Sequence, residues 1–373
     1  MRCLQDSFEI HLLCPGNGLL VENARRENIR IHIIPYFWSL TLRPFFWTQA
    51  FFFPANLITL LFIVRLFRKL KFDLVYTNTC VAFSGPLAAK LCNIPHIWHI
   101  HEAFGPGSYE YSFPFFSQKA IARQILTLSN IVIVNSNHIR QCFSLQTSKN
   151  IQLVYNGFSL SGKLAGDEKK LEIRKRYGLD PDDIVLSIVG SIQKMKGHLS
   201  AIRAMPSILK KHPNAKLLIA GKFTQGSYFY KKTIESEIAI HHLNDAIIFL
   251  GNISDVSQLY LITDILLVPS LYEPFGRTIV EAAFYKVPCI ASNVGGIPEI
   301  IENGVDGILF SSGDSTGMAA AVLDLLKDRN KRNALGENAS KRIPPRFVMT
   351  NIIQEVANII NQTLNSSGVT FAP

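Results

Sequence analysis

Two carboxylates flank a glycine in the stretch SLYEPFGRTIVEAAFYKVPCIASNVGG, residues 270–296. Glu273 stands just before Pro274, and proline suits the first position of a helix because it needs no amide partner there. Gly276 then falls in the first turn of the predicted helix. Glu281 lies seven residues past Pro274, two turns further on and on roughly the same face. The spacing predicts a ligand site built around the start of this helix.

The start of such a helix attracts anions, because its first amides are free and carry a partial positive charge. The missing side chain at Gly276 lets a phosphate come close. Carboxylates repel a phosphate, so the expected targets of Glu273 and Glu281 are neutral hydroxyls, which they can bind in pairs. A nucleotide sugar offers a pyrophosphate flanked by two polyols. Glu281 would bind its ribose and Glu273 the transferred sugar.

A lysine points to the same ligand from another part of the chain. The apolar stretch DIVLSIVG, residues 183–190, predicts a strand that runs into a loop containing Lys196 and then into a helix. A lysine at a helix start opposes the macrodipole and is disfavoured unless an anion binds there. Lys196 therefore indicates a phosphate ligand. The loop is not G-x-G-x-x-G, which counts against a dinucleotide-dependent oxidoreductase.

The motifs around the two carboxylates resemble those of a known family. The run S-x-x-E-P-F-G-R-x-x-V-E-A is followed by P-x-I-A-S-x-x-G-G-x-P-E-I-I and by N-G-x-x-G-x-L. The spacing of Glu273 and Glu281 alone arises by chance in many helices, whereas the full run to Leu309 is specific. It resembles the retaining glycosyltransferases of family 4, which have the GT-B fold. The resemblance implies an α/β protein of two Rossmann-like, doubly wound domains that face each other across a cleft.

The resemblance also implies roles for residues of the second domain. Lys196 matches the family's phosphate-binding lysine, and Ser191 stands where the family commonly has arginine. Gly251 ends a strand whose following loop lines the base pocket in the family. Glu273 is expected to orient the sugar and not to attack it. The implied donor-binding residues are Ser191, Lys196, Gly251, Glu273, Phe275, Gly276, Arg277 and Glu281.

Two histidines alternate along the predicted strand in PHIWHIHE, with His99 and His101 on one face. They could chelate a metal, although no third ligand stands at an established spacing. They could equally be satisfied core histidines. The resemblance implies a third interpretation, in which His101 binds the donor sugar and Glu102 lies near the acceptor hydroxyl. The implied catalytic residues are His101, Glu102, Glu273 and Lys196, with no metal and no cofactor.

The composition indicates what kind of partner the protein binds and in which cellular compartment to expect it. The formal charge of +10 indicates an anionic partner. A nucleic acid would need a basic stripe within a recognisable motif, and none is found. Six cysteines are scattered without a C-x-x-C pair, so the sequence suggests neither a zinc knuckle nor a disulfide framework, and it favours a reducing compartment. No secretory signal is visible, so the expected location is the cytoplasm.

Residues 44–64, PFFWTQAFFFPANLITLLFIV, are uncharged and have basic residues on both sides. Three interpretations are open: an element that dips into a membrane surface, an ordinary buried helix, and a transmembrane helix. Aromatic residues beside a basic flank favour the first, with anionic lipid headgroups as the partner. We therefore expect a peripheral protein on the inner face of the plasma membrane.

The composition becomes charged and glycine-containing over residues 161–183, which places a linker there. The expected domains are an acceptor-side domain over residues 1–160 and a nucleotide-sugar domain over 161–344. A last helix within 345–373 is expected to cross back to the first domain. The family's first strand and glycine-rich loop have no counterpart before Glu9. Either the true start lies upstream, or the protein lacks that strand and part of the site.

The expected reaction is the metal-independent transfer of a hexosyl unit from a UDP- or GDP-sugar to a hydroxyl, with retention of configuration. The acceptor would be a glycan or a lipid-linked molecule in surface polysaccharide biosynthesis. Two alternatives are open. One is a non-catalytic relative that binds a nucleotide sugar or a partner transferase, and the other is a sugar-nucleotide epimerase of the same fold.

Overall fold

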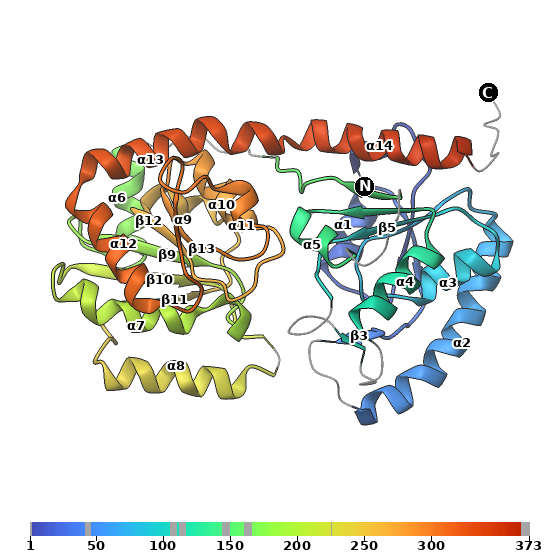
Figure 1. Ribbon diagram of the computed structural model, residues 1–373, viewed down its shortest axis with the longest axis horizontal. Helices are drawn as coiled ribbons and strands as arrows, with labels where there is room; N and C mark the ends of the chain where they lie inside the picture. Colours follow the sequence, from blue (N-terminus) through green and yellow to red (C-terminus); the bar gives the residue numbers. More distant parts are fainter. Residues whose placement is uncertain are drawn as a thin grey trace. The chain divides into compact units, whose positions relative to one another are not determined.

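The computed structural model describes residues 2–41, 46–104, 110–111, 117–143, 150–159, 166–224 and 226–366. The chain divides into two compact units, each with a parallel sheet and helices (Figure 1). The first unit comprises Met1–Tyr155 with Thr350–Pro373, and the second comprises Asn156–Met349. The protein is thus of the α/β class.

The first unit is built on a four-stranded parallel sheet of order β4-β5-β7-β8. The central strand β5 is buried along its whole length, as expected where helices cover both faces of a parallel sheet. Three helices of this unit follow its strands. The elements are β4 (Val75–Thr77), α3 (Ser84–Leu91), β5 (His96–Ile100), α4 (Gln118–Leu128), β7 (Ile131–Val134), α5 (Asn137–Gln141) and β8 (Ile151–Leu153).

The start of the chain forms a separate parallel pair, β1 with β2. Within the described residues this pair does not join the four-stranded sheet. A short antiparallel pair, β3 with β6, completes the strands described in this unit. The elements are η1 (Arg2–Leu4), β1 (His11–Cys14), α1 (Leu19–Arg26), β2 (Arg30–Ile33), β3 (Leu40–Thr41) and β6 (Glu110–Tyr111).

The uncharged stretch forms most of helix α2 (Phe46–Leu70), which continues beyond it into the basic residues and packs beside α3. Its polar residues bind the segment that follows β2: the Asn56 Oδ1 accepts from the amide of Phe37 at 2.9 Å, and the Thr59 hydroxyl donates to Pro35 O at 2.7 Å. None of the helices in the described ranges has the length and apolarity that a membrane span requires.

The last helix, α14 (Met349–Ser366), packs on the sheet of the first unit. Its buried side chains Ile359, Ile360 and Leu364 contact Ile97 and Ile133. The amphipathic pattern of this helix is thus used against strands that lie far earlier in the chain.

The second unit is built on a six-stranded parallel sheet of order β11-β10-β9-β12-β13-β14. The chain runs outward from β9 to β11 and then returns to the other side of β9, so the switch in direction lies between β9 and β12. The strands are β9 (Ile184–Val189), β10 (Ala215–Ala220), β11 (Ile247–Gly251), β12 (Ile265–Val268), β13 (Cys289–Ser292) and β14 (Ile308–Phe310). The helices are α6 (Asp167–Arg176), η2 (Lys194–Lys196), α7 (His198–Leu209), α8 (Tyr228–Ile240), α9 (Ser257–Ile262), α10 (Arg277–Phe284), α11 (Ile297–Ile300), α12 (Ser315–Lys327), α13 (Arg329–Arg342) and η3 (Pro344–Phe347).

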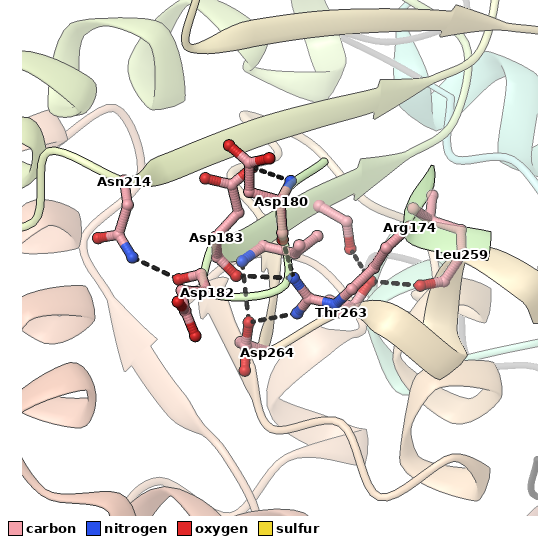
Figure 2. A network of polar contacts seen from close by, with 10 residues as sticks. Arg174, Asp180, Asp182, Asp183, Asn214, Leu259, Thr263 and Asp264 are labelled. Atoms are coloured by element: carbon pink, nitrogen blue, oxygen red, sulfur yellow. Dashed lines mark hydrogen bonds and ion pairs between the residues drawn. The ribbon is translucent and has the colours of Figure 1, made fainter. Parts of the chain in front are cut away.

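A polar network fixes the amino ends of β9 and β12 (Figure 2). The Arg174 guanidinium of α6 donates to Asp183 O at 2.9 Å and lies 3.7 Å from the Asp264 carboxylate. The same carboxylate accepts the amide of Val185 at 2.8 Å. Because one carboxylate binds both α6 and the first residues of β9, it sets the position of β9 against β12.

Asp264→Ala removes the acceptor for the Val185 amide and the partner of Arg174. We expect it to lower the free energy of unfolding by about 1–3 kcal/mol, because these groups are partly buried. Urea denaturation of the full chain measures the loss, and faster amide exchange at Val185 locates it. The control is Asp167→Ala at the exposed start of α6, with an expected change within about 0.5 kcal/mol. Equal effects of the two changes would contradict a special role for Asp264.

Candidate functional site

An ion pair joins the two loops at the switch point of the second unit. Lys196 follows β9 and Glu273 follows β12, and the Lys196 Nζ lies 2.7 Å from the Glu273 Oε2. The Ser270 hydroxyl donates to the same oxygen at 3.2 Å. Ligands of open parallel sheets bind beyond the carboxyl ends of the strands at this kind of position. The structure therefore brings together two residues that stand far apart in the sequence.

Burial makes this pairing necessary. Glu273 is only 8% exposed, and a carboxylate so far removed from water is costly unless a cation or hydrogen bonds compensate it. Lys196 supplies the cation. The sequence analysis proposed a bound phosphate as the anion beside Lys196, and in the structure the Glu273 carboxylate supplies a negative charge there.

Two glycines allow the loops to come this close. Gly197 has φ +68°, and a Cβ there would lie 1.8 Å from Pro269 O. Gly295, after β13, has φ +59°, and its Cβ would lie 1.8 Å from Glu273 O. Only glycine fits at either position, because the neighbouring atoms belong to the backbone.

The helix behind Glu273 begins later than the sequence predicted. The prediction that Pro274 is its first residue is wrong: α10 begins at Arg277, and Gly276 is its N-cap with φ +114°. The left-handed conformation of Gly276 is incompatible with a helical turn and so delays the start. Phe275 is 2% exposed and packs between the rings of Phe158 and Phe347. Its side chain is part of the core, so only its backbone is available to a ligand.

Glu281 lies on α10 and is held by two neighbours. The Tyr260 hydroxyl of α9 donates to its Oε2 at 3.0 Å, and the Arg277 guanidinium lies 3.4 Å from its Oε1. Burial, and next the charge of Glu281, raises the pKa of Tyr260 well above its usual value, so the hydroxyl stays protonated and remains a donor. The carboxylate side chain of Glu281 is 25% exposed. Sequence analysis missed Tyr260, because no local spacing connects it with Glu281.

Ser191 follows β9 and Gly251 ends β11, and β10 lies between these two strands. The Ser191 hydroxyl accepts from the Gln193 side chain at 3.0 Å. Gly251, with φ +65°, ends β11, and its carbonyl accepts the amide of Gly221 at 2.7 Å. A Cβ at Gly251 would meet no atom within 4 Å, so there is open space beside this backbone.

His198, the first residue of α7, lies close to Lys196 and is fully buried. Burial, followed by the charge of Lys196, lowers the pKa of His198 to about 4. The imidazole is therefore neutral near pH 7 and adds no second positive charge beside the ammonium.

The implied pair of the first unit, His101 and Glu102, lies at the end of β5. The His101 Nε2 lies 2.7 Å from the Asn78 Oδ1. The Glu102 carboxylate accepts from the Thr79 hydroxyl and from the amide of Cys80, both at 3.0 Å. Both of its oxygens thus hold the loop that follows β4.

The described residues around His99 do not form a metal site. The Tyr76 hydroxyl lies 2.6 Å from the His99 Nδ1. Burial, and then the charge of His101, holds the pKa of His99 well below its usual value, so its ring stays neutral. Within the described ranges no group of three or more His, Cys, Asp or Glu side chains is placed to bind a metal. His99 is accordingly a core histidine.

Comparisons with known proteins bear on the family and the fold. The model of Glycosyltransferase Family 4 matches residues 1–161, and that of Glycosyl transferases group 1 matches residues 169–342. The chain is 30% identical over 240 residues to the N-acetyl-alpha-D-glucosaminyl L-malate synthase of Bacillus anthracis, a match that covers 64% of this chain and 60% of that enzyme.

Two further proteins are similar over most of their length. The chain is 27% identical over 325 residues to the capsular polysaccharide biosynthesis glycosyltransferase CapM of Staphylococcus aureus, covering 84% of this chain and 83% of CapM. The crystal structure of Anabaena HepE in complex with UDP-glucose matches with a TM-score of 0.79 at 23% identity, over 94% of this chain and 91% of HepE. That likeness gives the fold as GT-B.

The two family models match in order along nearly the whole chain, over the two units that carry the predicted site residues. This chain therefore belongs to the group 1 glycosyltransferases of family 4, which transfer a sugar from a nucleotide sugar.

Proposed function

We propose that this protein transfers a hexosyl unit from a UDP- or GDP-sugar to a hydroxyl of a glycan or lipid-linked acceptor in surface polysaccharide biosynthesis. The observation that carries the proposal is the pairing of Lys196 with Glu273 at the switch point, together with the held carboxylate of Glu281 on α10. The relative CapM is a capsular polysaccharide glycosyltransferase, and HepE was crystallised in complex with UDP-glucose, which supports a UDP-sugar donor and this product class.

A diphosphate at the Lys196 ammonium would compete with Glu273 for that cation. The exchange would leave Lys196 and the first amides of α10 to stabilise the leaving diphosphate. It would also free the Glu273 carboxylate to accept hydrogen bonds from sugar hydroxyls. One ion pair thus links donor binding to the orientation of the sugar.

Glu281 would accept the two ribose hydroxyls, with the backbone beside Gly251 near the base. In the first unit, His101 would contact the donor sugar. Glu102 is proposed near the acceptor, and its two hydrogen bonds to the loop after β4 support a positioning role. Retention without a metal would follow from front-face attack assisted by the leaving phosphate, as the family resemblance implies.

The acceptor class implies a place of action. A lipid-linked acceptor carries its glycan at a membrane surface, so the enzyme would work in the cytoplasm at the inner face of the plasma membrane. The charge of +10 favours this site, because that surface is anionic.

A second candidate, a relative that binds the donor without transferring it, is favoured by one feature. Ser191 places a neutral hydroxyl where the family commonly has arginine, so this position adds no cation to the phosphate clamp. Donor binding without product formation would select this alternative, and a changed sugar without an acceptor would select the epimerase.

Donor binding tests the assignment of the site. Calorimetry with UDP- and GDP-sugars should show binding to the protein, weakened at least about tenfold by Lys196→Ala and by Glu281→Gln, or about 1.4 kcal/mol for each. The controls are Lys210→Ala and Glu168→Gln, exposed residues of the same unit, which should leave the affinity unchanged. Equal donor affinities of all four variants would mean that the donor binds at another site.

The stereochemistry and the metal requirement test the mechanism. With a suitable acceptor, NMR of the first product formed should show the anomeric configuration of the donor, because front-face attack retains it. Addition of EDTA should leave the rate unchanged, because Lys196 and backbone amides carry the charge stabilisation. An inverted product, or activity lost to EDTA and restored by Mg²⁺, would contradict this mechanism.

A further inference from the structure

The outward face of α2 is apolar where no described part of the protein covers it. Leu57, Ile58, Leu61 and Phe62 are 50%, 59%, 70% and 59% exposed, and they follow the helical spacing of one face. The core side of the same turns is occupied by other residues, with Ile63 fully buried. Four neighbouring large apolar side chains at the surface of one helix mark a surface that a partner could remove from water.

The same face becomes basic over the next turns. Arg65, Arg68 and Lys69 are all exposed, and α2 contains no acidic residue. We name the seven outward residues Leu57, Ile58, Leu61, Phe62, Arg65, Arg68 and Lys69 the α2 stripe. Along the chain it passes from an apolar half to a cationic half.

An open groove of about 400 Å³ lies where the stripe meets the segment that follows β2. Its lining is apolar except for the two cations Arg65 and Lys69. The apolar lining comes from Ile33, Ile34, Pro35, Phe62 and Leu66. This composition suits a ligand that joins an apolar chain to an anionic group.

We propose that the α2 stripe and its groove bind the surface of a membrane that contains anionic lipids. The apolar half enters the boundary between headgroups and acyl chains, while the cations of the other half pair with lipid phosphates. The inference deepens the proposed function, because it assigns the surface that holds the enzyme beside a lipid-linked acceptor. Its evidence is independent of the donor site.

The charge of the α2 stripe favours an anionic lipid surface as its partner over a second copy of this chain. In a two-fold dimer the same patch faces itself, so the stripe would meet another stripe with three cations and no carboxylate. The net charge of +10 adds repulsion between copies. An anionic lipid surface supplies both of the missing partners, acyl chains and phosphates.

Vesicle flotation of the full chain tests the proposal. The protein should float with phosphatidylcholine vesicles that contain phosphatidylglycerol and not with pure phosphatidylcholine, and added salt should weaken the binding. The double change Arg65→Gln with Lys69→Gln should weaken vesicle binding about 25-fold, because each cation is expected to contribute about fivefold. The matched control, Lys210→Gln with Lys211→Gln in the second unit, should bind as the unchanged protein does.

The apolar half is tested by Leu61→Ser with Phe62→Ser, which should weaken vesicle binding at least about tenfold. The exposed Ile240→Ser of α8 is its control. Circular dichroism should show that all variants fold, because each change is at the surface.

Three outcomes would overturn the inference: no flotation with anionic vesicles, equal flotation of the stripe variants and their controls, or a dimer in sedimentation that Leu61→Ser with Phe62→Ser dissociates. Calorimetric donor binding, measured on the same proteins, separates these results from a failure of the proposed function. The stripe variants should bind the nucleotide sugar unchanged.

Discussion

The pairing of one buried carboxylate with one ammonium organises the second unit of this protein. Glu273 is nearly removed from water, so its charge must be met by Lys196 and Ser270. Their meeting requires the loops after β9 and β12 to touch. Gly197 permits that contact, and Gly295 lets the loop after β13 approach Glu273, because a side chain at either would collide with backbone atoms. The ion pair between Lys196 and Glu273 therefore depends on the close approach of backbone segments as well as on charge.

Contacts at the opposite, amino ends of β9 and β12 also hold these two strands together. The Asp264 carboxylate binds α6 through Arg174 and binds β9 through the amide of Val185. With the amino ends of β9 and β12 tied together, their carboxyl ends emerge side by side. Loops on a fixed sheet can then exchange one ionic partner for another without rearranging the core. The proposed binding of a diphosphate at Lys196 would depend on such an exchange.

The first unit uses its polar residues differently. At the end of β5, both carboxylate oxygens of Glu102 accept hydrogen bonds from the loop after β4, and His99 is buried against Tyr76. These groups fix a strand end. On another side of this unit, α2 leaves an apolar and cationic face uncovered by the described residues. One unit thus combines a fixed strand end with a surface suited to an anionic, amphiphilic partner.

The sequence by itself determined the α/β class and the family, and it proposed the residues of the candidate site, because strand patterns and the motif around Glu273 are local. It misplaced one helix start and did not reveal some contacts between segments far apart in the chain. The predicted start of α10 was wrong because Gly276 adopts a left-handed conformation, and Phe275 entered the core because Phe158 and Phe347 surround it. Tyr260 was missed because only the packed fold brings it to Glu281. Local propensity specifies elements, whereas the partner of a buried charge and the exposed face of a helix are set by packing between segments far apart in the chain.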